Sequence, residues 1–122
     1  MYQVATAPVL TNEILNQDTK ISISTSHTIE LVNVSDILYL EGKENYCRIY
    51  LRNELSFLAN QSLGKMYEAL RPYNFFQCHK SYAINMEQVI RYWRIGIAEL
   101  KCGAKVPVAR RRRDGFMHKF KM

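Results

Sequence analysis

The sequence has few cysteines, and it lacks the segments that direct a chain into or across a membrane. Its three cysteines, Cys47, Cys78 and Cys102, are an odd number with no Cys-x-x-Cys spacing, which argues against a disulfide framework and a zinc knuckle. The N-terminus has no basic region followed by an apolar core, and no apolar run is long enough to cross a bilayer. We therefore expect reduced thiols, a cytoplasmic location and no membrane partner.

The sequence also lacks the motifs of common catalytic and cofactor sites. Its three histidines have no Cys, Asp or Glu at a recognised metal-ligand spacing, and there is neither a glycine-rich phosphate loop nor a nucleophile elbow. We therefore predict no metal, no cofactor and no enzymatic activity. One exception stays open, because His79 and Lys80 directly follow Cys78, and neighbouring cations lower the pKa of a thiol.

The apolar and aromatic residues that are present are enough for one β-rich domain. The chain has 122 residues, of which 48% are hydrophobic, and it includes eight Tyr and five Phe. This length is typical of a single domain, and aromatic and β-branched residues favour strands. Residues 1–18 show no sustained periodicity and are interpreted as an N-terminal tail or linker, whereas residues 19–122 are the predicted domain.

Several segments alternate apolar and polar residues in the way that strands do. The clearest lies over 46–52, where Cys47, Ile49 and Leu51 share one face and are predicted to face the core. A short apolar run over 37–40 is typical of a buried strand. The other predicted strands lie over 20–25, 28–32, 55–59, 89–94, 97–101 and 105–108.

One segment changes from the strand period to the period of a helix. Leu63, Met66, Tyr67 and Leu70 have the i, i+3, i+4, i+7 spacing of one helical face. Ser62 is a favourable N-cap residue, and a proline closes the segment. We predict this as the one main helix of a mostly β fold, with its apolar face packed in the core.

Positive charge is concentrated in the second half of the chain. Residues 1–61 hold four Lys/Arg and seven Asp/Glu, a net charge of −3, whereas residues 62–122 hold thirteen and four, a net charge of +9. Such asymmetry favours an anionic partner, either nucleic acid or an anionic membrane surface. The run Arg110–Arg113 is then either a solvated tail or a nucleic-acid contact positioned by the strand before it. Gly115 breaks a weak amphipathic pattern, which argues against a helix that lies on lipid.

The stretch Phe75–Asn85, which reads FFQCHKSYAIN, combines an apolar run with polar donors at a predicted turn. His79 donates or accepts through its ring, and Lys80 carries three donors on a cation, so the turn is suited to an anionic surface. The alternative is a hairpin edge with solvated charge, since lone His and Lys residues are common at turns. The residues alone leave both interpretations open.

Four segments, DILYLEGKENYCRIYL, SLGKMYEAL, FFQCHKSYAIN and KVPVARRRR, together resemble the LytTR family of bacterial DNA-binding domains, which lie at the C-terminus of response regulators. The resemblance runs from about Lys20 to Met122. It is most specific in the pattern F-x-C-H-x-S-y-x-x-N and in the pattern G-x-x-v-P-V-x-R that follows it. Ala109, where members often carry Ser, and Lys80, where some carry an amide, depart from the family pattern.

The resemblance implies an elongated, mostly antiparallel β fold with one packed helix, whose strand-end loops enter successive major grooves of double-stranded DNA. It implies DNA contacts at the loop end near Asn45 to Cys47, at the His79–Lys80 turn and at the Arg110–Arg111 start of the basic run.

The chemistry of these residues favours a role for each. Arg110 or Arg111 can bind the O6 and N7 edge of guanine, Asn45 can pair with adenine, and Lys80 can bind guanine or phosphate. Lys43, Arg112 and Arg113 are better suited to phosphate. The predicted DNA-contacting residues are Lys43, Asn45, Cys47, His79, Lys80, Arg110, Arg111, Arg112 and Arg113.

The sequence therefore favours a sequence-specific double-stranded DNA-binding domain of a bacterial transcription regulator. The alternative is a basic protein-interaction or membrane-surface module without specific DNA readout. The resemblance further implies direct repeats in promoters as targets, a homodimer on DNA, and control by a receiver domain or another regulatory protein. Whether the chain is part of a longer regulator or acts alone stays open at this point.

Overall fold

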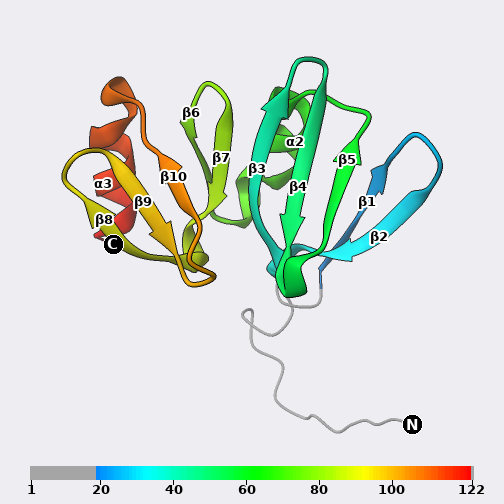
Figure 1. Ribbon diagram of the computed structural model, residues 1–122, viewed down its shortest axis with the longest axis horizontal. Coiled ribbons are helices and arrows are strands. Elements are labelled where there is room, and N and C mark those ends of the chain that lie inside the picture. The colour runs from blue at the N-terminus through cyan, green and yellow to red at the C-terminus, as the bar shows by residue number, and fades with distance from the viewer. Residues whose placement is uncertain (1–18, 122) are drawn as a thin grey trace, which may run out of the picture.

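The computed structural model describes residues 19–121, and the predicted tail or linker over 1–18 lies outside the described residues. Within them, strands form three antiparallel sheets and two short helices pack against these sheets (Figure 1). The two-stranded sheet pairs β1 with β2, the five-stranded sheet has the order β5-β4-β3-β7-β6, and the three-stranded sheet has the order β10-β9-β8. The elements are β1 (Lys20–Ser24), β2 (Ile29–Asn33), β3 (Ile37–Lys43), β4 (Tyr46–Leu51), β5 (Ser56–Ala59), α2 (Leu63–Leu70), β6 (Phe75–His79), β7 (Tyr82–Asn85), β8 (Val89–Trp93), β9 (Ile97–Leu100), β10 (Lys105–Pro107) and α3 (Arg113–Phe120).

Helix α2 forms where the sequence predicts the main helix. The Ser62 hydroxyl oxygen accepts a hydrogen bond from the backbone N–H of Lys65 at 3.3 Å, which caps the first turn. Leu63, Met66 and Leu70 are buried, so the predicted apolar face is the face that packs. The helix contacts β3, β4, β6 and β7 and thereby covers one face of the five-stranded sheet.

The covered face of the five-stranded sheet belongs to what we name the first core. Cys47, Ile49 and Leu51 are buried there, which confirms the alternation predicted for β4, and the β1–β2 hairpin adds Ile23 and Val32. The predicted strands are present with ends that agree or differ by one residue, except that β3 continues three residues beyond the predicted 37–40. The first core comprises Ile23, Val32, Val34, Ile37, Leu40, Cys47, Ile49, Leu51, Ala59, Leu63, Met66, Leu70, Phe75 and Ala83.

A second core lies between the β6–β7 hairpin, the three-stranded sheet and α3. It comprises Leu38, Cys78, Ile84, Met86, Ala98, Leu100, Val106, Val108 and Phe116. The β6–β7 hairpin contributes to both cores, because Phe75 and Ala83 face the first, whereas Cys78 and Ile84 face the second. The hairpin is therefore a wall that the two cores share.

The C-terminal segment forms a second helix, α3, which the sequence pattern did not predict. Its Phe116 is fully buried in the second core, where it packs with the ring of Phe76 and with two further aromatic rings. Gly115, interpreted above as a break in the pattern, allows the helix to approach β6, since an added Cβ would lie 3.1 Å from the Phe76 ring. Phe116 is the one fully buried residue of this helix, and Met117 and Phe120 pack against the same core without forming a regular apolar stripe, which is why its sequence pattern is weak.

We expect Phe116→Ala to destabilise the domain by about 3–5 kcal/mol, because it removes a fully buried ring and leaves a cavity. Urea denaturation followed by circular dichroism would show a lower midpoint. His118→Ala, at an exposed position of the same helix, is the matched control and should stay within about 0.5 kcal/mol of the parent chain. An unchanged midpoint for Phe116→Ala would contradict the assignment of α3 to the folded core.

Candidate nucleic-acid interface

Three segments lie along one edge of the molecule, at the top of Figure 1. They are the β3–β4 tip (residues 43–46), the β6–β7 tip (79–82) and the turn between β10 and α3 (109–112), and together we name them the contact edge. The backbone N–H of Gly42 donates to the carbonyl oxygen of Ser81 at 2.8 Å, and that of Ala109 donates to Cys78 at 2.8 Å. Two backbone hydrogen bonds thus join segments that are far apart in the sequence.

The β3–β4 tip is a tight hairpin loop. Lys43 pairs with Tyr46, and Glu44 and Asn45 connect them, with Glu44 in the left-handed region at a φ of 58°. All four residues are exposed. The predicted contacts Lys43 and Asn45 are therefore at the surface of the contact edge.

Cys47 is a correction to the predicted set of DNA contacts. Its side chain is fully buried in the first core, and its thiol donates to the Arg48 carbonyl oxygen at 3.9 Å. Burial raises the pKa of the thiol to about 12. Because side chains alternate along β4, a single step from the exposed Tyr46 turns Cys47 to the covered face. This thiol cannot touch DNA without unfolding the strand.

The β6–β7 tip places a ring donor and a cation side by side. The His79 Nδ1 atom accepts a hydrogen bond from the backbone N–H of Ser81 at 3.0 Å, and its ring packs edge-on against Tyr82. With Nδ1 used as an acceptor, the neutral ring carries its proton on Nε2 and can donate there. Lys80 is exposed at the turn itself. The tip therefore offers hydrogen-bond donors on a hairpin whose strands are anchored in both cores.

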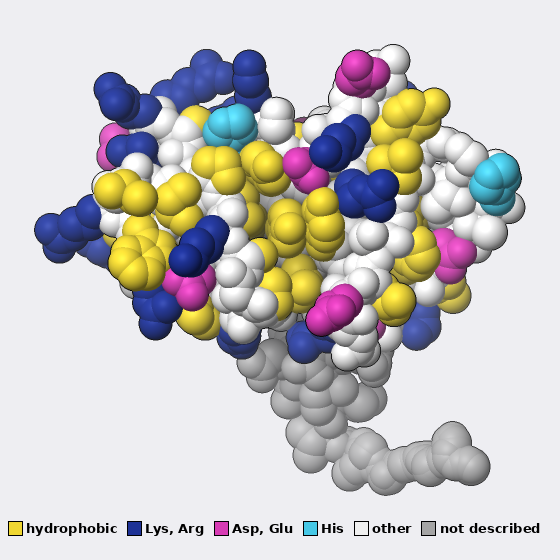
Figure 2. Space-filling view, in the orientation of Figure 1, with side chains coloured by type: hydrophobic (Ala, Val, Ile, Leu, Met, Phe, Trp, Pro, Cys, Tyr) yellow, Lys and Arg dark blue, Asp and Glu magenta, His cyan; other side chains and the backbone are white. Residues whose placement is uncertain are grey.

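The arginine run does not form a free tail. Arg110–Arg112 form a 3-10 turn in which the backbone N–H of Arg112 donates to the Ala109 carbonyl oxygen at 2.8 Å. Arg110 and Arg111 are exposed, and Arg112 is half-buried. Figure 2 shows Lys and Arg side chains gathered at this end of the contact edge, above β10 and α3. The run is thus a positioned cluster of cations.

Arg113 is a second correction, because its guanidinium group bonds within the protein. Its Nε donates to the Val108 carbonyl oxygen at 3.4 Å, and its Nη2 donates to the Ile95 carbonyl oxygen at 3.2 Å. The side chain packs over Gly96, where an added Cβ would meet the guanidinium group and where the φ of +103° favours glycine. Arg113 therefore fastens the start of α3 to the β8–β9 turn and is not placed as a free phosphate contact.

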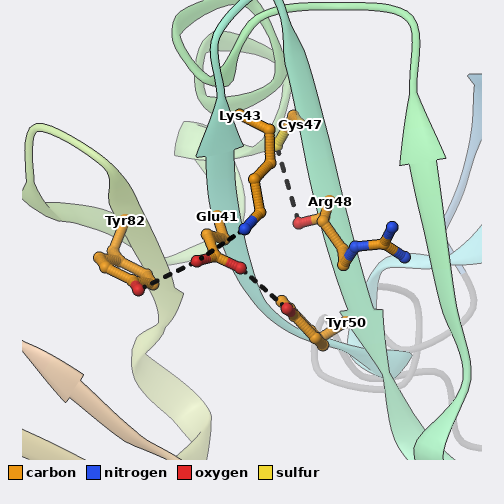
Figure 3. A network of polar contacts seen from close by, with 6 residues as sticks. All are labelled: Glu41, Lys43, Cys47, Arg48, Tyr50 and Tyr82. Atoms are coloured by element: carbon orange, nitrogen blue, oxygen red, sulfur yellow. Dashed lines mark hydrogen bonds and ion pairs between the residues drawn. The ribbon is translucent and has the colours of Figure 1, made fainter.

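The carboxylate of Glu41 lies between the β3–β4 and β6–β7 hairpins, and Glu41 was not among the residues predicted for the site. Figure 3 shows Glu41, which accepts from the Tyr50 hydroxyl on Oε1 at 2.8 Å and from the Tyr82 hydroxyl on Oε2 at 3.1 Å. Lys43 Nζ lies 3.4 Å from the same Oε2. The sequence held no local signal for this cluster, because Tyr82 is 41 positions from Glu41 and joins it only through the β3–β7 pairing.

The cluster sets the charges of its members. Partial burial acts to raise the pKa of Glu41, but the hydroxyls of Tyr50 and Tyr82 and the Lys43 cation together hold it below its usual value. Burial, followed by the hydrogen bond to Glu41, raises the pKa of Tyr50 to about 12. Glu41 is therefore charged and Tyr50 neutral at physiological pH.

The described residues offer little for other kinds of site. Among residues 19–121, no group of His, Cys, Asp and Glu is placed to hold a metal ion. No helix in this part of the chain is long and apolar enough to span a membrane. Cys78, the candidate reactive thiol, is fully buried, and burial raises its pKa to about 12, which is the opposite of activation.

Comparison with known proteins gives a consistent result. Residues 27–121 match the family described as LytTr DNA-binding domain. The transcriptional regulatory protein YpdB of Escherichia coli K12 is 27% identical over 87 residues, which are 71% of this chain and 34% of that protein. YpdB of Escherichia coli O6:H1 is 27% identical over 85 residues, 70% of this chain and 34% of its own length. The matched region thus spans about one third of the length of these curated relatives.

One solved structure is similar in fold. It is a LytTr DNA-binding domain from Bacillus cereus, with a TM-score of 0.72 and 20% sequence identity, and the match covers 84% of this chain and 97% of that one. The fold described above is therefore similar to that of a known three-dimensional structure.

The thiols give a direct test of the burial described here. At neutral pH we expect a disulfide thiol reagent to modify Cys102 alone in the folded chain, because Cys47 and Cys78 are buried and their pKa values are raised to about 12. In denaturant all three cysteines should react. Rapid modification of Cys78 in the folded chain would restore the reactive-thiol hypothesis.

The raised pKa of Tyr50 predicts a loss of stability at alkaline pH. The phenol ionises near pH 10 in the unfolded chain and at about 12 in the folded one. Its contribution is therefore full below pH 10 and falls as the pH rises toward 12, because the unfolded state releases the proton first. Urea denaturation across this window should show a shallower fall for Tyr50→Phe than for the parent chain. Equal slopes would mean that the hydroxyl has its ordinary pKa in the fold.

Proposed function

Because the chain belongs to the LytTR family of DNA-binding domains of bacterial transcription regulators, we propose that its contact edge reads a specific sequence of double-stranded DNA through successive major grooves. The family is not an enzyme family, which confirms the prediction of no enzymatic activity, and the resemblance seen in the sequence is confirmed as well. One observation carries the proposal: backbone hydrogen bonds unite three donor-bearing segments on a single edge.

The three segments supply different chemistry along that edge. Arg110 and Arg111 are exposed guanidinium groups on a fixed turn, and the geometry of guanidinium suits the O6 and N7 edge of guanine. At the other end, Asn45 has an amide that suits adenine. Between them, His79 Nε2 and Lys80 provide a donor and a cation.

Phosphate contacts accompany these base contacts. Lys43 and Arg112 flank the proposed base-reading side chains, and cations beside base contacts fix the register of the protein on the duplex. Arg113 and Cys47 are left out, because the first is bonded within the protein and the second is buried. The proposed contact set is therefore Lys43, Asn45, His79, Lys80, Arg110, Arg111 and Arg112.

The alternative of a membrane-surface or protein-interaction module has less support. An amphipathic helix on lipid needs a free apolar face, whereas Phe116 of α3 is buried in the second core and Met117 and Phe120 pack against it. We place the domain in the bacterial cytoplasm, where its proposed target is.

We further propose that a second copy binds a neighbouring direct repeat in a promoter. We also propose that a receiver domain or another regulatory protein controls binding, and the greater length of the curated relatives supports this control.

Selection from a randomised duplex pool, followed by titration of the selected duplex and a scrambled duplex across salt, tests specific readout. We expect the selected duplex to bind about a thousandfold or more tightly than the scrambled one at physiological salt. If both duplexes bind equally and lose affinity with the same salt slope, the contact edge is a phosphate-binding surface without sequence readout.

Single variants, measured with the same two duplexes, then test which tips contact the bases. Arg111→Ala and Lys80→Ala should each weaken binding to the selected duplex by about 1–3 kcal/mol, because each removes a base contact. Lys101→Ala is the matched control, since it removes one exposed cation from the β9–β10 turn at the opposite end of the molecule (Figure 1). A loss for Lys101→Ala as large as for the other two would show that total charge alone determines affinity.

A further inference from the structure

Two of the tips belong to separate hairpins, and their spacing must be fixed if both are to meet the base edges of one duplex. Strands β3 and β7 pair through Tyr39 with Ile84, Leu40 with Ala83 and Glu41 with Tyr82. The Glu41–Tyr82 pair is the last of these before the tips, and beyond it the backbone adds the bond from Gly42 to Ser81. The position of Glu41 is thus the place where the two hairpins begin to separate.

The Glu41 side chain connects the hairpins at this place. One carboxylate oxygen accepts from Tyr82 of β7, and the other accepts from Tyr50 of β4 (Figure 3). The side chain is only 20% exposed, so water competes weakly for these bonds. The rings are fixed as well, because Tyr50 stacks on Tyr39 at 4.3 Å and Tyr82 packs against His79 of the β6–β7 tip.

We propose that Glu41 is a positioning residue that sets the spacing between the β3–β4 and β6–β7 tips and so sharpens discrimination between DNA sequences. The proposal rests on the proposed DNA-reading function and names a residue that acts on that site without touching DNA. Through Tyr82 the carboxylate controls the hairpin of His79 and Lys80, and through Tyr50 and Lys43 it controls the hairpin of Asn45.

Glu41 can affect DNA binding in two ways, through its negative charge and through the positions of the tips, and the two effects have different consequences for binding. A carboxylate near an edge that binds phosphates lowers the affinity for every duplex alike, because it repels the backbone. A positioning effect acts differently, since fixed tips favour only the duplex whose base edges match their spacing. Loss of Glu41 should therefore raise the affinity for a scrambled duplex while it lowers the ratio of selected to scrambled binding.

Tyr82→Phe and Tyr50→Phe are a matched pair that tests the connection without any change of charge. Each variant removes one hydroxyl bonded to Glu41, but only Tyr82→Phe breaks a bond between the two hairpins, because Tyr50 and Glu41 belong to the same hairpin. We expect the ratio of selected to scrambled binding to fall about tenfold for Tyr82→Phe and less than about threefold for Tyr50→Phe. Thermal unfolding should show that both variants fold.

Changes in DNA spacing add a readout that a loss of stability would not produce. One base pair is inserted at each position of the selected duplex in turn, and the penalty is measured for each protein. Tyr82→Phe should show a smaller insertion penalty than the parent chain between the sites read by the two tips, because its tips can adjust. Equal penalties, or equal ratios for the two tyrosine variants, would overturn the positioning role.

Glu41→Gln, compared with Glu99→Gln, separates charge from position. Glu99 bonds to Arg91 at 3.1 Å and to Trp93 at 2.8 Å, both within the three-stranded sheet, so its loss removes the same charge without releasing a tip. Only Glu41→Gln should lower the ratio of selected to scrambled binding. Equal ratios in both variants would leave Glu41 with an electrostatic effect alone. Failure of the DNA-reading function itself is distinct, because the parent chain would then show no preference between duplexes.

Discussion

The β6–β7 hairpin is the constraint on which the rest of the structure depends. Phe75 and Ala83 pack on one side of it into the first core, and Cys78 and Ile84 pack on the other side into the second. A hairpin buried on both sides cannot shift without opening a cavity in one core or the other. Its tip accepts the Gly42 bond through Ser81, and its β6 strand accepts the Ala109 bond through Cys78. The other two segments of the contact edge are thus held relative to this one.

Charge and rigidity contribute different things to such an edge. The cations of the second half of the chain provide attraction to any polyanion, and this attraction weakens with salt. Discrimination needs donors at fixed positions, and here turns and side-chain bonds supply them: the His79 ring is held by the Ser81 N–H, and the arginine turn is held by Ala109. Glu41 and Glu44 place negative charge among these cations, which reduces the attraction to any polyanion.

The features that depend on local sequence patterns were predicted correctly. The capped helix at Leu63–Leu70 and the buried face of β4 follow from periodicity alone, and both were found as predicted. Features that depend on distant partners were missed. Helix α3 is held by Phe116, which packs against rings from β6 and β8. Arg113 cannot be distinguished from the other arginines of its run by sequence, because its partner Ile95 is distant in the chain. Cys47 was placed in the DNA contacts by resemblance although its strand alternation already assigned it to the core. Glu41 could not be found before the register between β3 and β7 was known.

The exposure of the contact edge has an evolutionary consequence. Lys43, Asn45, Lys80, Arg110 and Arg111 are exposed, and none of them belongs to either core. Substitutions at such surface positions usually change the free energy of unfolding by no more than about 0.5 kcal/mol. Selection can therefore change these side chains with little effect on folding, while the β6–β7 hairpin beneath them stays the same. Under the proposed function, a descendant of this domain would acquire a new operator by changing a handful of codons, and a gene duplication followed by such changes would yield two regulators with one scaffold.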